Sequence, residues 1–351
     1  MGRRALVGLM LLGLFSLAGV AEHPFFDSRL EAAVRDALGI PEGALHDDDL
    51  ASLETLTAVG REIAYLDGLE RCVSLKALDL GENRIRNLEP LSGLRKLESL
   101  VLRSNWITDI SPLAELTSLH RLDLDFNSVE DISPLVGLTS LRWLGLWNSR
   151  IRDVAPLADL VHLEELGLSG CPIADFSPLS HLTRLTWLGL PNTGVSDLGF
   201  LEPLTTLVKL SLGGNQIVDL SPLAGLVRLE GLGLDSNEII DLSPLAGLAT
   251  LRRLSLWGNR ITDLSPLGGM LLLEQLWVDR NPLEDIGVVG RFTNLRMLGL
   301  TGTMIHDLSP LAENPGLGEG DTIDLRELPE LSDDAQETVR LLIERGADVL
   351  R

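Results

Sequence analysis

The sequence predicts an α/β fold in the form of an elongated solenoid, in which each repeat adds one short strand to a single parallel sheet. Two observations lead to this prediction. Leucine recurs every 22 residues, at positions 75, 97, 119, 141, 163, 185, 207, 229, 251, 273 and 295. Apolar residues make up 45% of the 351 residues but aromatic residues only 4%, so the core must consist of aliphatic side chains. Such a period is typical of stacked repeats that bury their apolar faces against one another.

Residues 1–21 have the pattern of a secretory signal peptide. Arg3 and Arg4 precede an uncharged apolar run from Ala5 to Ala21, and small residues at positions 19 and 21 fit a cleavage site before Glu22. An uncleaved anchor is the alternative, although 17 residues is near the shortest length that spans a bilayer. No later apolar run is long enough to span. We therefore expect a secreted or periplasmic protein.

Residues 22–52 are expected to form a helical cap that shields the first turn of the core. The stretch Phe25–Gly39 has the apolar spacing of a helix, with Asp27 or Ser28 as its N-cap and Gly39 as its stop. A second short helix should begin near Asp47–Asp49. We interpret these aspartates as helix caps, because their spacing lacks the alternation of a calcium-binding loop.

Residues 53–316 comprise one degenerate and eleven regular copies of L-x-x-L-x-L-x-x-N-x-I-x-D-L-S-P-L-x-x-L-x-x. The L-x-L pair points alternate side chains of a strand inward. Asparagine in the ninth column can bond backbone groups where the chain turns. Aspartate fills the thirteenth column in ten of eleven copies. With the Ser-Pro that follows, it predicts a short helical turn that has Pro first and Asp or Ser as its cap.

These columns resemble the 22-residue class of leucine-rich repeats, and in particular the internalin-like proteins of bacteria. The segments that carry the resemblance are copies of N-x-I-x-D-[LI]-S-P-L, such as Asn105 to Leu113 and Asn259 to Leu267. The resemblance implies a right-handed solenoid with a parallel concave sheet and short helical turns on its convex side, used to bind a partner protein. No wall-anchoring signal follows the repeats before Arg351, so the mode of surface attachment stays open.

Residues 317–351 are expected to cap the other end of the solenoid. Thr322–Leu325 should be a final strand, and a helix should run from Ser332 to Arg345, with Asp334 and Glu337 at capping-box spacing and Gly346 as the stop. The end of this segment is similar to the end of an ankyrin repeat. One copy cannot stack, so we interpret it as a cap.

Cys72 and Cys171 are predicted to be buried free thiols. Cys72 falls in a leucine column and Cys171 in the asparagine column. Their repeats are five coils apart, roughly 24 Å at about 4.8 Å per strand. A disulfide needs Cα atoms within about 7 Å.

The third, fifth, seventh and eighth columns should point outward from the concave sheet, and five of the six tryptophans fall in them. Glycines at positions 145, 167 and 189 lie beside three of these tryptophans, so we expect indole rings that stand above a low floor. Exposed aromatic residues interleaved with arginine are typical of interface hot spots. The candidate binding residues are Phe126, Trp143, Trp147 and Trp187 in the middle, Trp257 and Trp277, beside Met297, towards the C-terminal end, and Arg121, Asp125, Arg253, Asp279 and Arg280 around them. The alternative is that the tryptophans merely cover the sheet.

The sequence holds no pattern of an enzyme, a cofactor site or a metal site. The six histidines occupy different repeat phases or the cap, so none are paired as metal ligands. The glycines of residues 316–320 match no phosphate or dinucleotide motif. Asp123 and Asp125 could suggest acid–base chemistry, but Arg103 and Arg121 favour a salt-linked rim.

Three functions remain open at this point. We expect first a monomeric, exported protein that recognises a protein partner through its aromatic concave face, as an adhesin or receptor does. The second hypothesis is binding of a glycan or cell wall by the same face. The third is an intracellular regulatory subunit of an enzyme, as in the related regulatory subunit of protein phosphatase 1. The net charge of −22 argues against nucleic acid as a partner, but ten acidic residues belong to the repeat and say little about a ligand.

Overall fold

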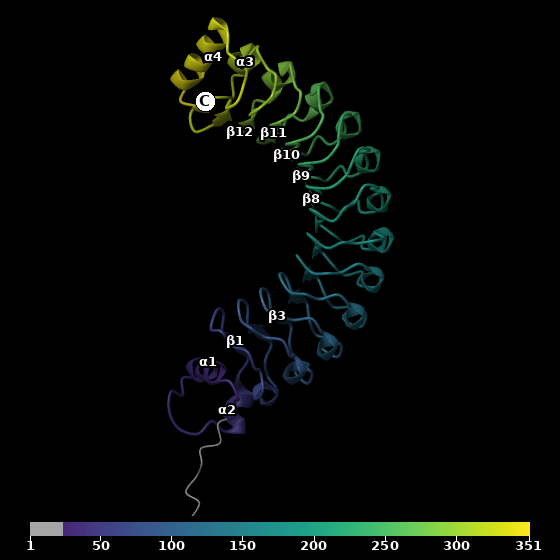
Figure 1. The fold of residues 1–351 in the computed structure, drawn as a ribbon, viewed down its shortest axis with the longest axis vertical. Helices are drawn as coiled ribbons and strands as arrows, with labels where there is room; N and C mark the ends of the chain where they lie inside the picture. The colour runs from purple at the N-terminus through teal and green to yellow at the C-terminus, as the bar shows by residue number, and fades with distance from the viewer. Residues whose placement is uncertain (1–23) are drawn as a thin grey trace, which may run out of the picture.

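The computed structural model describes residues 24–351, which form one solenoid bent into an open arc (Figure 1). The strands lie on the inner side of the arc and the short helices on its outer side. This confirms the predicted α/β solenoid with a parallel concave sheet. The predicted signal segment, residues 1–21, lies outside the described residues. Among those described, no helix is long and apolar enough to cross a membrane.

The sheet contains 14 parallel strands in the order of the chain. Leu78 pairs with Leu100, and the same shift of one 22-residue repeat relates each pair of neighbours from β1 to β12. The strands are β1 (Thr55–Thr57), β2 (Ala77–Asp79), β3 (Ser99–Val101), β4 (Arg121–Asp123), β5 (Trp143–Gly145), β6 (Glu165–Gly167), β7 (Trp187–Gly189), β8 (Lys209–Ser211), β9 (Gly231–Gly233), β10 (Arg253–Ser255), β11 (Gln275–Trp277), β12 (Met297–Gly299), β13 (Thr322–Asp324) and β14 (Asp348–Leu350).

Most coils carry a 3-10 helix opposite the strand, where the sequence predicts a short helical turn. These helices are η1 (Leu69–Arg71), η2 (Glu89–Leu91), η3 (Ser111–Leu113), η4 (Ser133–Leu135), η5 (Ala155–Leu157), η6 (Ser177–His181), η7 (Gly199–Leu201), η8 (Ser221–Leu223), η9 (Ser243–Leu245), η10 (Ser265–Gly269) and η11 (Gly287–Arg291). The prediction of Pro as the first residue is wrong, because Ser111 begins η3 and proline follows it. The aspartate is the cap. Asp109 Oδ1 accepts the N–H of Ser111 at 2.8 Å, and this bond holds the pKa of Asp109 below its usual value.

The asparagine column forms a ladder of buried hydrogen bonds along the solenoid. Asn127 Nδ2 donates to the carbonyl oxygens of Leu102 and Leu124, each at 3.0 Å, and Oδ1 accepts the N–H of Ile107 at 3.0 Å. Each asparagine of this kind thus joins its own coil to the preceding one. The ladder is interrupted in the middle, where serine, cysteine and threonine occupy the column in three successive repeats.

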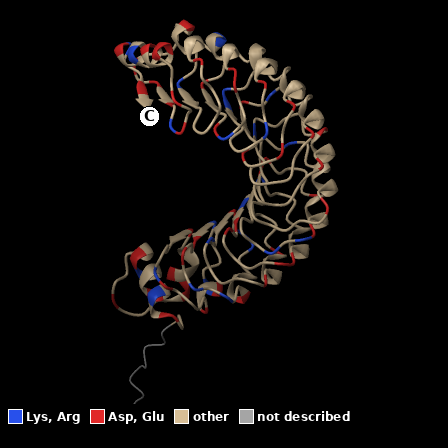
Figure 2. Ribbon diagram, turned by 45° about the horizontal axis from the view of Figure 1, so that its top comes forward, with Lys and Arg blue, Asp and Glu red and all other residues tan. Residues whose placement is uncertain are grey.

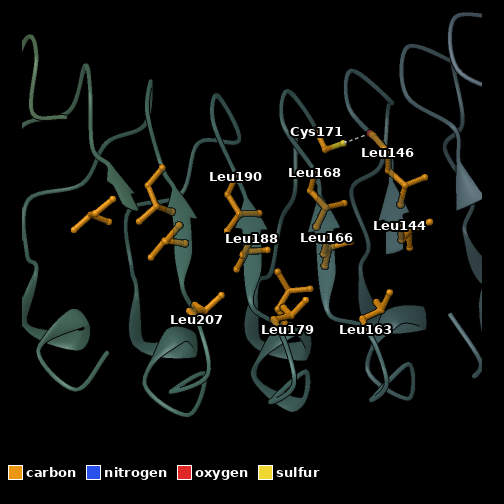
Figure 3. Close-up of a cluster of buried hydrophobic side chains, with 14 of the residues drawn as sticks. Leu144, Leu146, Leu163, Leu166, Leu168, Cys171, Leu179, Leu188, Leu190 and Leu207 are labelled. Atoms are coloured by element: carbon orange, nitrogen blue, oxygen red, sulfur yellow. Dashed lines mark hydrogen bonds between the residues drawn. The ribbon is translucent and has the colours of Figure 1, made fainter. Parts of the chain in front are cut away.

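Leucine side chains from successive coils stack into one continuous core between the sheet and the outer turns (Figure 3). Cys171 lies at the edge of this core and donates from Sγ to the carbonyl oxygen of Leu146 at 3.1 Å, which substitutes for one bond of the missing asparagine. Cys72 is also buried, and both thiols are unpaired, as predicted. Burial raises the pKa of both thiols to about 11, so each stays protonated at neutral pH.

The N-terminal helices α1 (Ser28–Leu38) and α2 (Asp47–Ser52) precede β1, as the sequence predicts. Asp27 is the N-cap of α1 and accepts the N–H of Arg29 at 2.9 Å. Its other carboxylate oxygen accepts the N–H of Ala64 at 2.8 Å, which attaches the helix to the first coil. Gly39 ends α1 in the left-handed conformation.

The C-terminal end differs from the prediction in two respects. Thr322–Leu325 does contain a strand, β13, but it is not the last one, because β14 extends the sheet after helix α4 (Asp333–Glu344). The N-cap of α4 is Ser332 rather than Asp334, since Ser332 Oγ accepts the N–H of Ala335 at 3.2 Å. A short helix, α3 (Ser309–Glu313), replaces the 3-10 turn of the last regular repeat.

Candidate functional site

The predicted binding residues lie in two clusters on the concave sheet. The middle cluster comprises Arg121 on β4, Asp125 and Phe126 just after β4, Trp143 on β5, Trp147 just after β5, and Trp187 on β7. The C-terminal cluster comprises Arg253 on β10, Trp257 after β10, Trp277 on β11, and Asp279 and Arg280 after β11. In each strand from β1 to β13 the central residue is buried.

The tryptophans of the middle cluster lie against the sheet, so the expectation of rings that stand above a low floor is wrong. A Cβ atom added at Gly167 would lie 2.0 Å from Trp147 Nε1, and one added at Gly189 would lie 2.9 Å from a ring carbon of Trp187. The glycines therefore make room for rings that cover the backbone. Each indole is only partly exposed. The cluster is consequently a low aromatic surface.

Contacts within the middle cluster fix the orientation of its rings. Trp147 and Trp187 have ring centroids 6.2 Å apart at an angle of 32°. The guanidinium carbon of Arg121 lies 3.6 Å from the centroid of the Trp143 ring, in cation–π geometry. Arg121 also reaches the carboxylate of Asp123 at 3.8 Å. These side chains are therefore held in place before any partner arrives, which lowers the entropic cost of binding.

Asp125 links the middle cluster to the backbone of the next coil. Its Oδ1 accepts the N–H of Trp147 at 2.8 Å and lies where a side chain at position 145 would otherwise stand. Burial raises the pKa of Asp125 to about 6, and the neighbouring carboxylate of Asp123 adds to this rise although the Trp147 bond opposes it. Of the salt-linked rim that the sequence predicts, Arg121 reaches Asp123 at 3.8 Å, whereas Arg103 pairs with Glu82 at 3.2 Å and Asp125 bonds the backbone.

Phe126 occupies the eighth column, where the backbone is left-handed. Its φ is 56°, a value that bulky residues rarely adopt and that glycine supplies in five other coils at this column. The side chain is 50% exposed. Other non-glycine residues of this column adopt the same conformation, such as Glu82 and Arg280, so the positive φ belongs to the repeat and not to Phe126 alone. The exposed ring beside the tryptophans has no role in the core and adds to the aromatic surface.

The C-terminal cluster is more open than the middle one. Trp257 is 37% exposed, and the guanidinium carbon of Arg280 lies 5.6 Å from its ring centroid. Asp279 is buried and accepts the N–H of Thr301 at 2.9 Å, and burial raises the pKa of its carboxyl. Trp277 and Gln275 lie on the neighbouring strand, and Arg253 is exposed.

Sequence reasoning missed two hollows between these clusters. One of about 480 Å³ is lined by Trp143, Glu165, Trp187 and Lys209, among others. The second, of about 360 Å³, adjoins it at Trp187 and Lys209 and continues to Arg253. The signal that could have found them is the small residues of the outward columns, Ser211 on β8 and both Gly231 and Gly233 on β9, which leave Lys209 as the one large outward side chain of these two strands.

The remaining features of residues 24–351 give no sign of catalysis. No group of three histidine, cysteine or acidic side chains is placed to hold a metal ion among them. His162 Nδ1 lies 2.9 Å from the guanidinium of Arg184 at the surface. Trp106, the tryptophan outside the concave columns, lies on the edge of the solenoid and contacts Arg86 at 5.0 Å. Acidic and basic residues are interspersed along the coils rather than gathered on one face (Figure 2).

Comparison with known proteins identifies the repeats. A family model described as leucine rich repeats (2 copies) matches residues 95–137, 139–181, 205–247 and 249–290. An internalin (InlF) of Listeria monocytogenes is 31% identical, with a TM-score of 0.75 over 88% of this chain and 96% of that chain. Curated protein sequences give no significant match.

Two more distant structures share the fold. A leucine-rich repeat protein of Leptospira interrogans is 21% identical, with a TM-score of 0.70 over 82% of this chain and 81% of that chain. The ectodomain of the receptor kinase GASSHO1/SCHENGEN3 of Arabidopsis thaliana, solved in complex with Casparian strip integrity factor 2, is 21% identical. Its TM-score is 0.61 over 76% of this chain and 37% of that chain.

Proposed function

The chain belongs to the internalin-like leucine-rich repeat proteins, and from this premise we propose that it is an exported binding protein that captures a protein partner on its concave face. The observation that carries the proposal is the aromatic surface of the middle cluster, in a protein whose core is aliphatic. Tryptophan beside arginine is the composition of interface hot spots. The receptor ectodomain of the same fold that was solved in complex with Casparian strip integrity factor 2 supports the use of this fold for binding.

The mechanism follows from the geometry of the rings. Each half-exposed indole loses its remaining contact with water when a partner covers it, and the backbone below it is already packed. Because Arg121 packs on the Trp143 ring and the Trp147 and Trp187 rings pack on each other, little side-chain freedom is lost on association. The mixed charges around the clusters then set the orientation and the rate of encounter more than the affinity.

The arrangement favours a protein over a glycan as the ligand. Stacking of a sugar needs a free ring face, but the outer region of Trp143 is occupied by the Arg121 guanidinium 3.6 Å from the ring centroid. Titration of tryptophan fluorescence with cell-wall oligosaccharides tests the alternative. Saturable quenching by a sugar would replace the protein partner with a glycan.

The test begins with cross-linking of the mature protein to extracellular material, followed by mass spectrometry to identify a partner. The variant Trp143→Ala/Trp147→Ala should then lower affinity by roughly 4 kcal/mol, about a thousandfold in Kd, if each residue is a hot spot of about 2 kcal/mol. The matched control is Trp106→Ala, which removes a tryptophan that is 51% exposed and stacked on an arginine but lies outside the concave columns.

If circular dichroism shows that both variants are folded and the double variant binds the partner as tightly as the control, the proposal is refuted. Export has its own readout. Sequencing of the N-terminus of the native protein should find Glu22 as the first residue, and an intact Met1 on a cytosolic protein would instead support the intracellular regulatory role.

A further inference from the structure

The concave sheet is hollowed between the two clusters, where its outward columns contain almost no side chain. Lys209 on β8 pairs with Gly231 on β9, which pairs in turn with Arg253 on β10. The next outward residue of β9 is Gly233, so nothing larger than a hydrogen atom rises from that strand. The two hollows of about 480 and 360 Å³ meet here, with Trp187 on their shared border.

Two cations without partners flank this hollow. The side chains of Lys209 and Arg253 are exposed, and neither forms a hydrogen bond or ion pair with another residue between 24 and 351. The neighbouring Arg252 differs, because its guanidinium is bonded to Glu274 at 2.5 Å. Lys209 and Arg253 lie two strands apart, about 10 Å at about 4.8 Å per strand, so both flexible side chains can reach one group placed over Gly231.

The carboxylates nearby leave these two charges uncompensated. Glu230 lies at the edge of the hollow where β9 begins, and Glu165 lines the far side of Trp187. Asp235 follows β9, and its Oδ2 lies 3.8 Å from the position that a Cβ of Gly233 would occupy, while its Oδ1 accepts a hydrogen bond from the Ser255 hydroxyl. The chain has a net charge of −22, yet Lys209 and Arg253 lie on either side of Gly231 without ion-pair partners in the described part of the chain. This arrangement favours the binding of an anionic group.

We infer that the hollow is a subsite for a carboxylate of the protein partner, an aspartate or glutamate on an exposed loop that enters over Gly231 and bonds Lys209 and Arg253. An apolar residue beside that carboxylate packs on Trp187, which borders the same space. The inference rests on the proposed function and adds the chemistry of the partner. An acidic glycan fits less well, because one of the two rings that border the hollow, Trp143, is stacked with Arg121.

The experiment uses fluorescence anisotropy with two labelled nonapeptides, one of alternating leucine and glutamate and one with glutamine in place of each glutamate. The wild-type protein should bind the glutamate peptide at least tenfold more tightly, because hydrogen bonds between charged groups contribute about 1.5–3 kcal/mol. The variant Lys209→Gln/Arg253→Gln should lose this preference. The control Lys96→Gln/Arg228→Gln removes the same charge from exposed positions outside the outward columns and should keep it.

Equal affinity of the two peptides for the wild-type protein would overturn the inference, and so would an equal loss in the control variant, which would indicate general electrostatics. Oligogalacturonate that binds more tightly than the peptide and is lost in the same variant would assign the subsite to an acidic glycan instead. The same variants distinguish a failure of the carboxylate subsite from a failure of the proposed function. If Lys209→Gln/Arg253→Gln still captures the cross-linked partner with unchanged Kd while Trp143→Ala/Trp147→Ala does not, the concave interface stands and the carboxylate subsite is wrong.

Discussion

Replacement of Asn127 by alanine should destabilise the solenoid more than the same change at Asn105, one coil earlier. Asn127 is buried and bonds four backbone groups: it donates to the carbonyls of Leu102, Leu124 and Asp125 and accepts the N–H of Ile107. The Leu124 carbonyl has no second side-chain donor, because the residue in the same column of the next coil is Ser149, whose buried hydroxyl forms no hydrogen bond. Asn127→Ala therefore leaves two buried groups, the Leu124 carbonyl and the Ile107 N–H, without the partners they have now.

The matched control is Asn105→Ala in the preceding coil. Asn105 is as buried as Asn127 and forms the equivalent bonds, to the carbonyls of Leu80 and Leu102 and from the N–H of Ile85. Both carbonyls keep a bond from a neighbouring asparagine, Leu102 from Asn127 for example. Only the Ile85 N–H is orphaned. At about 1–3 kcal/mol for each unsatisfied buried group, Asn127→Ala should lower the free energy of unfolding by about 2–6 kcal/mol and Asn105→Ala by about 1–3 kcal/mol.

Urea unfolding followed by far-ultraviolet circular dichroism measures both variants against the wild type. The reasoning requires a larger loss for Asn127→Ala, with an unchanged slope of free energy against denaturant that shows the same surface to be exposed. Equal losses, or a larger loss for Asn105→Ala, would refute the view that the break in the ladder makes Asn127 a special position.

Two further predictions concern the middle cluster. The pKa of Asp125 in the folded protein, about 6, lies above its value in the unfolded chain. Between about pH 4 and 6 the folded state therefore binds more protons than the unfolded state. The free energy of unfolding of the wild type should rise through Asp125 as the pH falls through this window. Asp125→Asn, which keeps an acceptor for the Trp147 N–H, should remove that gain, and identical plots of Tm against pH for the two proteins would contradict this. Gly167→Ala should displace the Trp147 ring and shift tryptophan emission to longer wavelength, because the new Cβ would lie 2.0 Å from Nε1. The control variant Gly225→Ala should cause no shift, because a Cβ there meets no atom within 4 Å. An equal shift in the two variants would contradict the packing of Trp147 on Gly167.

Most of the fold could be predicted because each column of the repeat has one physical task that recurs in every coil. Leu78 and Leu100 are equivalent by sequence spacing alone, and they pair in the sheet. The same holds for the asparagine ladder and the aspartate caps, whose partners lie at fixed distances along the chain. The 22-residue period of the sequence therefore determines the register of the parallel strands, and the register determines which residues point outward from the sheet.

The C-terminal end is harder to predict because the period is lost there. The spacing between paired strands rises from 22 residues to 25 between Met297 and Thr322, and to 26 between Thr322 and Asp348. Repeats can be counted only while the interval is constant, so the sequence does not predict β14 as a strand of the sheet. Ser332 and Asp334 are both good N-caps, and sequence spacing alone favoured the wrong one.

The orientation of the tryptophans could not be predicted from their own positions, because it depends on the column opposite. A side chain in the seventh column lies over the fifth column of the next coil. Trp147 meets Gly167 there and lies flat, whereas the residue in that column opposite Trp257 is Trp277, and Trp257 stays 37% exposed.

Third-column residues follow the same logic within one strand. Trp187 lies on Gly189, and Trp143 lies on Gly145 beside the Asp125 carboxylate. At Gly299 the Asp279 carboxylate occupies this space alone, and Met297 remains 37% exposed. The two clusters therefore differ for a steric reason. Each tryptophan ring of the middle cluster covers a glycine, whereas in the C-terminal cluster Trp277 stands where Trp257 would need a glycine, and Trp257 remains 37% exposed.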